Sequence, residues 1–218
     1  KALHREAQLI GIADALGVDA TQRRAQVTSE IEAWAQPDAA TRRGTRCFVY
    51  DDAARGIVGL EPSFGSELFN DHHFHYGYFL YAAGVLAADD PDLAEKLAPV
   101  MNLLAADIAT SSTNEYFVSR RNFDSYASHS WASGTVPFAD GNNQESASEA
   151  VTAYAGLTLW ARASGNEDLE TEARWMHALE AASAQAAYNV PFNEKYFPTA
   201  KTVRGKLMQT TQFDSRGR

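Results

Sequence analysis

The spacing of apolar residues constrains the fold of this chain most strongly, because most of it repeats with the period of an α-helix. We expect helices at about residues 1–17, 20–36, 70–88, 91–109, 143–163 and 166–188. Residues 17–19, Asp90-Pro91 and Gly165-Asn166 separate successive helices, as typical helix ends and breaks do. The sequence therefore predicts a mainly α protein of successive helical hairpins, without a clear sequence repeat.

Two parts of the chain depart from the helix period. Residues 46–50 and 56–60 are short β-like runs around a turn-forming segment, and they predict a small β-hairpin near residues 46–60. Residues 110–142 form a long connection, and such connections in compact domains are usually functional or disordered. Its aromatic content argues against disorder. The aromatic residues are Phe117, Phe123, Tyr126, Trp131 and Phe138.

Composition restricts the class of partner. The 218 residues suffice for one sizeable domain, and we treat residues 1–218 as a single region. A formal net charge of −9 argues against a nucleic-acid partner. No apolar run approaches the roughly 18–20 residues that cross a bilayer, so we expect no membrane partner. Cys47 is the only cysteine, which excludes an intrachain disulfide and a cysteine-based zinc site.

The two ends of the chain carry less information. Residues 1–6 lead directly into an amphipathic helix, with neither a start methionine nor a signal peptide. We therefore expect a processed or excised piece of a longer protein. The tail from Val190 reads as irregular.

The densest group of ionisable and aromatic residues spans positions 69–78, directly before an apolar run. Asp71 fits a helix N-cap, and it also fits a reactive carboxylate held at a helix start. The two interpretations are compatible. His72 and His75 share one helix face, but the zinc-protease pattern of His at i and i+4 with an intervening Glu is absent. We expect these histidines to bond a polar ligand or to pack rather than to hold a metal ion.

A second group spans residues 141–149 and opens the next expected helix. Glu145 and Glu149 stand on one helix face, with no Lys or Arg three or four positions away to offset their repulsion. A capping box with Asn142 would explain Glu145 but not Glu149. Small neighbouring residues leave space for a ligand, which favours a functional role for both acids.

Asp71 at one helix start and the pair Glu145 and Glu149 at another suggest general acid and base catalysis on a polar substrate. Glycoside hydrolysis needs two carboxyl groups across the scissile bond. Aromatic side chains nearby offer flat faces on which sugar rings stack, although we expect Phe74 and Tyr81 to pack in the core. The other rings are Tyr76, Tyr78, Tyr126 and Trp131.

Three ordered motifs in this sequence resemble glycoside hydrolase family 81, the endo-β-1,3-glucanases or laminarinases of bacteria, fungi and plants. The first is NDHHFHYGY at residues 70–78. The second joins RNFD at 121–124 to HSWASG at 129–134, and the third is NNQESASEA at 142–150. Residues 1–45 and 196–218 carry no motif of the family.

The resemblance implies an (α/α)6 barrel and hydrolysis with inversion at the anomeric carbon. Asp71 matches the general acid of the family, Glu145 the general base, and Glu149 a second Glu important for activity. Family members are much longer and carry a β-sandwich domain, so the chain resembles a partial barrel without its other domains. The resemblance implies a β-1,3-glucan substrate, secretion, and neither cofactor nor metal.

We expect eight further residues of these motifs to bind or orient sugar and water. They are His75, Tyr76, Tyr78, Asp124, His129, Trp131, Asn143 and Gln144. Two alternatives stay open: a helical module that binds β-glucan without cutting it, and a metal-dependent hydrolase using His72, His75 and Asp71.

Overall fold

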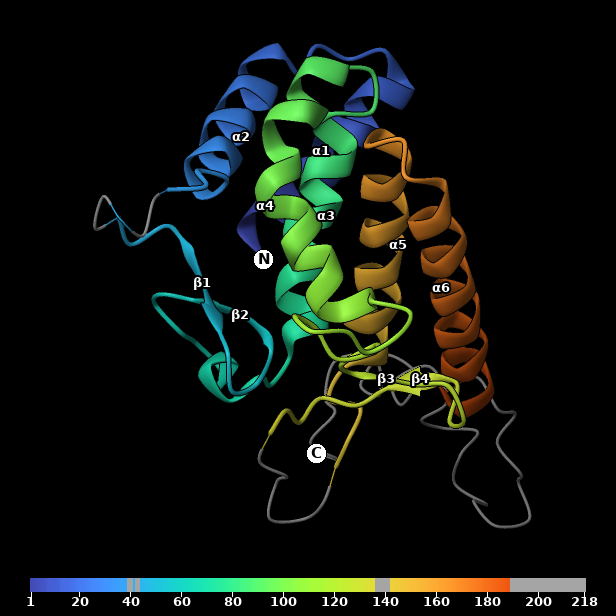
Figure 1. The fold of residues 1–218 in the computed structure, drawn as a ribbon. Helices are drawn as coiled ribbons and strands as arrows, with labels where there is room; N and C mark the ends of the chain where they lie inside the picture. Colours follow the sequence, from blue (N-terminus) through green and yellow to red (C-terminus); the bar gives the residue numbers. More distant parts are fainter. Residues whose placement is uncertain (39–40, 42–43, 136–141, 189–218) are drawn as a thin grey trace, which may run out of the picture.

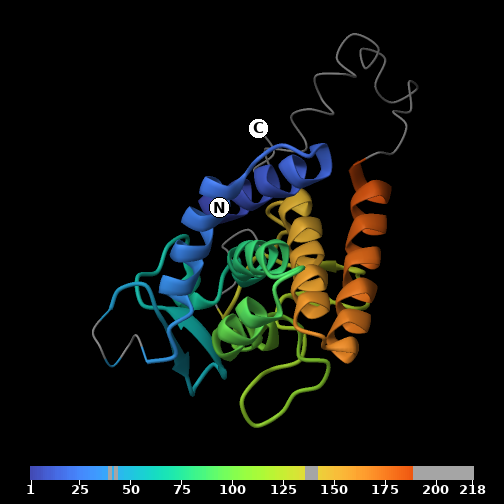
Figure 2. The same cartoon turned by 90° about the horizontal axis from the view of Figure 1, so that it is seen from above.

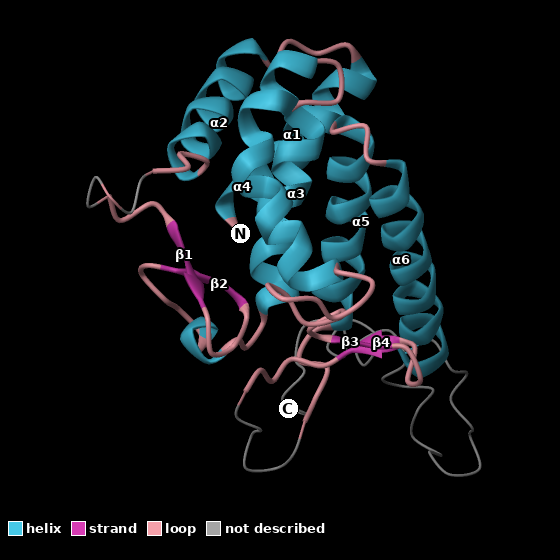
Figure 3. Ribbon diagram, in the orientation of Figure 1, coloured by secondary structure: helices cyan, strands magenta, loops and turns pink. Residues whose placement is uncertain are grey.

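The computed structural model describes residues 1–38, 41, 44–135 and 142–188. Phe138 and the tail from Val190 lie outside the described residues. Helices predominate (Figure 3). The elements are α1 (Ala2–Leu16), α2 (Thr21–Trp34), β1 (Phe48–Asp51), β2 (Gly56–Gly59), the 3-10 turn η1 (Ser66–Leu68), α3 (His72–Leu86), α4 (Pro91–Ala109), β3 (Phe123–Asp124), β4 (His129–Ser130), α5 (Ala147–Ala163) and α6 (Glu167–Tyr188).

Helix α3 lies at the centre, with α1, α4 and α5 packed around it and α6 outside α5 (Figures 1 and 2). Helices α3 and α5 approach so closely that a Cβ added at Gly77 would lie 2.5 Å from Cα of Ala153. A Cβ at Gly84 would lie 2.6 Å from the backbone of Leu159, one to two turns further along both helices. The two helices therefore run parallel, and their N-terminal ends lie side by side.

The core fills the space between these helices. It is built mainly from apolar side chains that recur at helix spacing, as the sequence predicted. Large side chains with almost no exposed surface include Leu80, Leu97, Met101, Leu104, Ile108, Tyr154, Leu157 and Trp160. Phe74 is also buried, which confirms its predicted place in the core.

Two antiparallel hairpins stand outside the helical layer. The first pairs β1 with β2, and Phe48 is opposite Gly59. The second pairs β3 with β4 inside the long connection, and Phe123 is opposite Ser130. The mainly α fold and the first hairpin are confirmed. The second hairpin was not predicted, because strands of two residues carry no alternation that a sequence could show.

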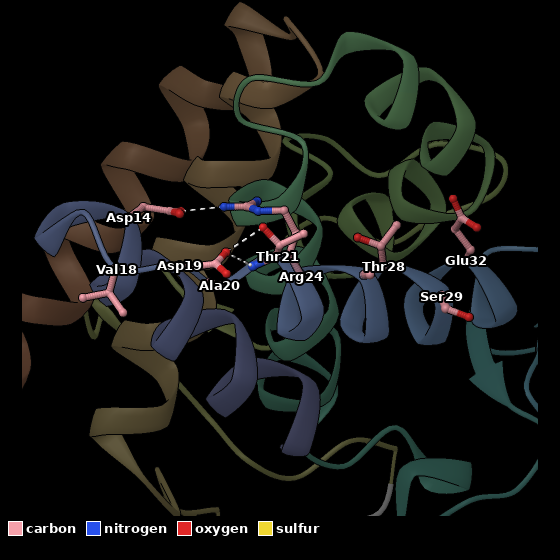
Figure 4. Close-up of a pocket in the computed structure, with 10 residues that line it drawn as sticks. Asp14, Val18, Asp19, Ala20, Thr21, Arg24, Thr28, Ser29 and Glu32 are labelled. Atoms are coloured by element: carbon pink, nitrogen blue, oxygen red, sulfur yellow. Dashed lines mark hydrogen bonds and ion pairs between the residues drawn. The ribbon is translucent and has the colours of Figure 1, made fainter.

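Within the described part of the chain, no helix is both long and apolar enough to cross a bilayer. A surface hollow of about 670 Å³ lies at the turn between α1 and α2 (Figure 4). Its wall includes the ion pair of Arg24 with Asp14, at 2.6 Å. None of the residues of the three motifs lines this hollow.

Candidate active site

Asp71 occupies the N-cap position of α3, as expected, but its side chain makes no capping hydrogen bond. Its backbone carbonyl accepts from the His75 N–H at 2.9 Å, which begins the helix. Its Oδ1 is buried and has no hydrogen-bond partner among the described residues. Burial, then the nearby carboxylates of Glu145 and Glu149, raise the pKa of Asp71 to about 7. The carboxyl group is therefore protonated over much of the range below neutral pH.

The two glutamates lie at the start of α5. Glu145 precedes the N-cap Ser146, whose Oγ accepts from the Glu149 N–H at 3.3 Å. The alternative of a capping box between Asn142 and Glu145 does not form, because Ser146 takes the cap. Helix α5 begins at Ala147 rather than at the expected 143. The Asn142 side chain instead accepts from the Ser133 N–H at 3.2 Å.

Glu149 does have a cation beside it, supplied from a distant part of the chain. Its Oε1 lies 2.5 Å from Nζ of Lys1, ahead of α1. The sequence correctly showed no Lys or Arg within four positions along the helix. The pair forms only because α1 packs against α3.

Both proposed catalytic positions have a strained backbone. Asp71 has a φ of 57° and Glu145 a φ of 58°, in the left-handed region that L-residues rarely adopt. Such strain costs of order 1–3 kcal/mol and clusters at functional sites. The backbone thus holds each carboxyl at a sharp turn just before or at a helix start.

One short stretch, residues 131–135, joins the segments that carry these acids; we call it the connecting segment. The Ala132 carbonyl accepts from the Asp71 N–H at 2.9 Å, and the Ala132 N–H donates to the Asn143 carbonyl at 2.8 Å. The Gly134 N–H donates to Oδ1 of Asn70 at 2.7 Å. A Cβ at Gly134 would lie 2.1 Å from the Leu68 carbonyl oxygen, so only glycine fits there. The three sequence motifs therefore meet in space.

The three histidines of the first motif have different surroundings. His72 is buried, its Nδ1 lies 2.7 Å from Oδ2 of Asp107, and its Nε2 donates to the Ser66 carbonyl at 2.8 Å. His73 is buried without a hydrogen-bond partner among the described residues, and burial lowers its pKa to about 3. Burial likewise lowers the pKa of His75 to about 4. His72 has no ring nitrogen left for a metal ion.

Metal ligands do not gather in the described part of the chain. No three His, Cys, Asp or Glu side chains there are arranged to hold an ion. The metal-dependent alternative required His72 together with His75 and Asp71. His72 cannot serve as a ligand, because both of its ring nitrogens are hydrogen-bonded, one to Asp107 and one to Ser66.

Of the two tyrosines expected at the site, only Tyr78 lies beside the acids. Tyr76 is 3% exposed and its hydroxyl donates to the Ile57 carbonyl, so it anchors the first hairpin in the core instead of offering a face to sugar. The Tyr78 hydroxyl is buried beside the carboxylate of Glu149. Burial, then hydrogen bonding to Glu149 and the negative charges of Glu149 and Asp71, raise the pKa of Tyr78.

The second hairpin carries three more of the expected residues. Asp124 accepts from Nε1–H of Trp131 at 3.0 Å. That bond, with backbone N–H groups, lowers the pKa of Asp124. His129 contacts the Trp131 ring edge-on, with centroids 4.4 Å apart. Asp124, His129 and Trp131 thus hold one another in place. Tyr126, at the tip of the hairpin, is 100% exposed.

The turn before α5 carries the last two expected residues. Asn143 has a buried Oδ1 without a hydrogen-bond partner among the described residues. The Gln144 carbonyl accepts from the Ser146 N–H at 2.6 Å. Asn143 thus offers an unused acceptor close to the connecting segment.

Sequence reasoning missed three charged residues that shape the site: Lys1, Asp107 and Glu180. Asp107 and Glu180 are almost fully buried and hydrogen-bonded. Both stand within apolar helical runs, next to Ile108 and Leu179 respectively. A lone carboxylate among apolar residues on a buried face is the signal that could have found them.

Comparison with known proteins places the chain in a family. Residues 1–209 match the model of the "Glycosyl hydrolase family 81 C-terminal domain". A glucan endo-1,3-beta-D-glucosidase of Acetivibrio thermocellus is 45% identical over 139 residues, covering 62% of this chain and 18% of that protein. One of Thermobifida fusca is 36% identical over 189 residues, covering 84% and 25%.

A solved structure agrees with these relatives. A mutant of a glycoside hydrolase family 81 protein from Clostridium thermocellum superposes with a TM-score of 0.74 at 35% identity, over 84% of this chain and 26% of that one. The class is thus a helical glycoside hydrolase domain. The chain belongs to glycoside hydrolase family 81, and it spans about a quarter or less of the length of these relatives.

Proposed function

We propose that this chain carries the acid and the base of an endo-β-1,3-glucanase that cleaves internal β-1,3-glucosidic bonds with inversion. The observation that carries the proposal is the carboxyl of Asp71, which is partly buried, lacks a hydrogen-bond partner for Oδ1, and has its pKa raised to about 7. A general acid must hold its proton at the working pH, and this environment favours the protonated form. The names of the family relatives support the substrate class.

In this mechanism Asp71 donates its proton to the glycosidic oxygen as the bond from that oxygen to the anomeric carbon breaks. Glu145 takes a proton from a water molecule, whose oxygen bonds to the anomeric carbon from the opposite face. Asp71 ends as a carboxylate and Glu145 as an acid, and proton exchange with solvent restores both. Glu149 supports the acid, because its negative charge contributes to the raised pKa of Asp71.

The remaining motif residues would orient sugar hydroxyls and water. Asn143 has a buried Oδ1 without a partner among the described residues, which a sugar hydroxyl or a water could satisfy. The Tyr78 hydroxyl lies beside Glu149, where it would face the same ligand. His75, Asp124, His129, Trp131 and Gln144 complete the set of proposed contacts. Tyr76 is left out, since its hydroxyl and its ring are both buried within the protein.

The rest of the proposal concerns the whole protein. Residues 1–218 would form one region of a helical barrel whose other parts and further domains lie elsewhere in the full-length enzyme. The whole enzyme would be secreted and would act on β-1,3-glucan outside the cell. The small share of the relatives' length that this chain covers supports the need for further parts.

Hydrolysis of laminarin by the full-length protein tests the proposal. We expect Asp71→Asn and Glu145→Gln each to lower kcat by about 10²- to 10⁴-fold, the range of general acid or base catalysis. Asp90→Asn is a matched control, because Asp90 also caps a helix and asparagine caps equally well. Proton NMR of the first products should show the α-anomer.

Equal rates in all variants would contradict the acid/base assignment. A first product with the β-anomer would contradict inversion. Glucan binding without release of sugar by the wild type would instead support the binding-module alternative.

A further inference from the structure

Glu180 on α6 is a buried carboxyl group that the proposed mechanism does not use. It is 1% exposed, and its Oε2 accepts from both the N–H and the hydroxyl of Ser130, at 2.8 and 3.0 Å. The Ser130 hydroxyl also lies 2.6 Å from the hydroxyl of Tyr154 on α5. Ser130 is thus bonded to two helices at once.

Ser130 is directly followed by the connecting segment, residues 131–135. Two residues further on, Ala132 accepts from the Asp71 N–H and donates to the Asn143 carbonyl. Glu180 is therefore linked to the proposed acid through Ser130 and the two residues that follow it. Tyr154 and Glu180 hold Ser130, and Ala132 is bonded to the Asp71 N–H.

The hairpin before this segment gives little support by itself. Strands β3 and β4 have two residues each, and an isolated two-stranded hairpin is at best marginally stable in water. A buried carboxyl is also costly: burial raises the pKa of Glu180 to about 7, although the bonds to Ser130 act in the opposite direction. An apolar side chain would fill the same space at lower cost, but it could not accept two hydrogen bonds from Ser130.

We propose that Glu180 is a positioning residue for the acid and base: through Ser130 it fixes the connecting segment against the turns that carry Asp71 and Asn143. This inference rests on the proposed function. Glu180 takes no part in proton transfer and acts only by holding Ser130 in place. Among the described residues its carboxylate is hydrogen-bonded to Ser130 and to neither Asp71 nor Glu145.

Three variants of the full-length protein test this inference. Glu180→Ala removes both acceptor bonds, and Glu180→Gln keeps an oxygen that can accept them. Glu170 lies on the same helix as Glu180, and Glu170→Ala removes its exposed ion pair with Arg162 of α5. We expect Glu180→Ala to lower kcat by about 10- to 100-fold, because small misplacements of reacting groups are this costly, with a smaller change in KM. Glu180→Gln and Glu170→Ala should stay within about threefold of wild type.

The pH profile separates positioning from mere stabilisation. The alkaline limb of kcat reports the ionisation of the general acid in the complex. It should shift in Glu180→Ala and return in Glu180→Gln. A Glu180→Ala protein with a lower Tm but with wild-type kcat and an unchanged alkaline limb would overturn the inference.

Two further outcomes are decisive. If Glu180→Ala does not fold, Ser130→Ala replaces it, because it removes the hydroxyl and leaves the Ser130 N–H bonded to Glu180. It should lower kcat by about three- to tenfold, and an unchanged kcat would overturn the inference. If Asp71→Asn keeps the wild-type rate, the proposed function itself fails. Loss of activity in Asp71→Asn but not in the Glu180 or Ser130 variants rejects only the positioning role.

Discussion

Two polar clusters flank the start of α3, and they differ in how their carboxyl groups are satisfied. The buried ion cluster contains His72, Asp107 and Arg121. The acidic cluster contains Asp71, Glu145 and Glu149, whose carboxylates lie close enough to raise the pKa of Asp71. Asp71 and His72 are neighbours at the start of α3, but their surroundings differ in charge. His72 lies in a cluster where opposite charges are paired, and Asp71 lies beside two groups of its own charge.

Asp107 is completely partnered. Its Oδ1 accepts from the Ile57 N–H at 3.0 Å and from Nε–H of Arg121 at 3.1 Å, while Oδ2 lies 2.7 Å from the His72 ring. Arg121 also donates to the Arg55 carbonyl at 2.7 Å and so ties the first hairpin to α4. Asp71 has none of these supports on Oδ1. A buried carboxylate with a full set of partners holds the fold, and one without them is available for chemistry.

The largest effect on stability should come from Asp107. We expect Asp107→Ala to lower the free energy of unfolding by about 3–5 kcal/mol, because it leaves Arg121 buried without its carboxylate. Denaturation in urea measures the change. Asp71→Ala is the matched control in the acidic cluster. If it lowered the free energy of unfolding as much as Asp107→Ala does, the two carboxyl groups would not differ in their structural role.

The difference in stability between wild type and Asp71→Asn should also depend on pH, in a direction that follows from the raised pKa of Asp71. The folded-state pKa of about 7 exceeds the ordinary value of 3.8, so ionisation opposes folding. Wild type should therefore lose stability relative to Asp71→Asn as the pH rises from about 4 to about 7, and the difference should level off above that range. Thermal unfolding of both proteins across this range measures it. A difference that stays constant with pH would contradict the assignment of the shift to Asp71.

The next effect concerns the connecting segment, which is bonded to Asp71 and Asn143. Gly134→Ala should destabilise the protein by about 1–3 kcal/mol, since the added Cβ would lie 2.1 Å from the Leu68 carbonyl oxygen. Gly11→Ala is the control, because nothing lies within 4 Å of its Cβ position and alanine favours the helix. Urea denaturation of both variants compares them. Equal stability would mean that the segment does not pack tightly against the turn of Asp71.

A smaller effect distinguishes the two helix starts. Ser146→Ala should cost about 1 kcal/mol, because the Ser146 side chain caps α5. Asp71 makes no such bond at the start of α3. Glycine adopts the positive φ of Asp71 without strain, so Asp71→Gly tests the cap alone. Measured by thermal unfolding at a pH below the raised pKa of Asp71, Asp71→Gly should cost less than Ser146→Ala. The reverse order would show that Asp71 serves as a structural cap.

The smallest effect lies within the acidic cluster. Glu149→Gln removes one of the two negative charges that raise the pKa of Asp71. The alkaline limb of the kcat profile should therefore move to lower pH. The pH dependence of laminarin hydrolysis by Glu149→Gln and wild type measures the shift, with Glu170→Gln as a distant control. A limb that moves to higher pH would contradict the proposed role of Glu149.

Most of the fold could be predicted from the sequence because helix periodicity is a local property. The boundaries of α4 and α6 agree with the expected 91–109 and 166–188 to within a residue. The start of α5 was placed four residues early, since periodicity does not reveal which of several polar residues takes the cap. Ser146 takes it, and Glu145 adopts a positive φ outside the helix.

The candidate site could be predicted only in part. The motifs named Asp71, Glu145 and Glu149, and tertiary packing brings these three together. Tyr76 and Tyr78 are two positions apart on one helix, and the sequence gives no means to tell which one the first hairpin covers. Asp107 and Glu180 were missed because their partners, Arg121 and Ser130, lie 14 and 50 residues away.

The proposed mechanism requires that the buried environment of Asp71 keeps its carboxyl protonated near neutral pH. Carbon-13 NMR titration of the Asp71 side-chain carboxyl, assigned by comparison with Asp71→Asn, measures this directly. We predict a midpoint close to the value of about 7 that burial and the two glutamates produce. A midpoint at or below the ordinary value of 3.8 would contradict the account.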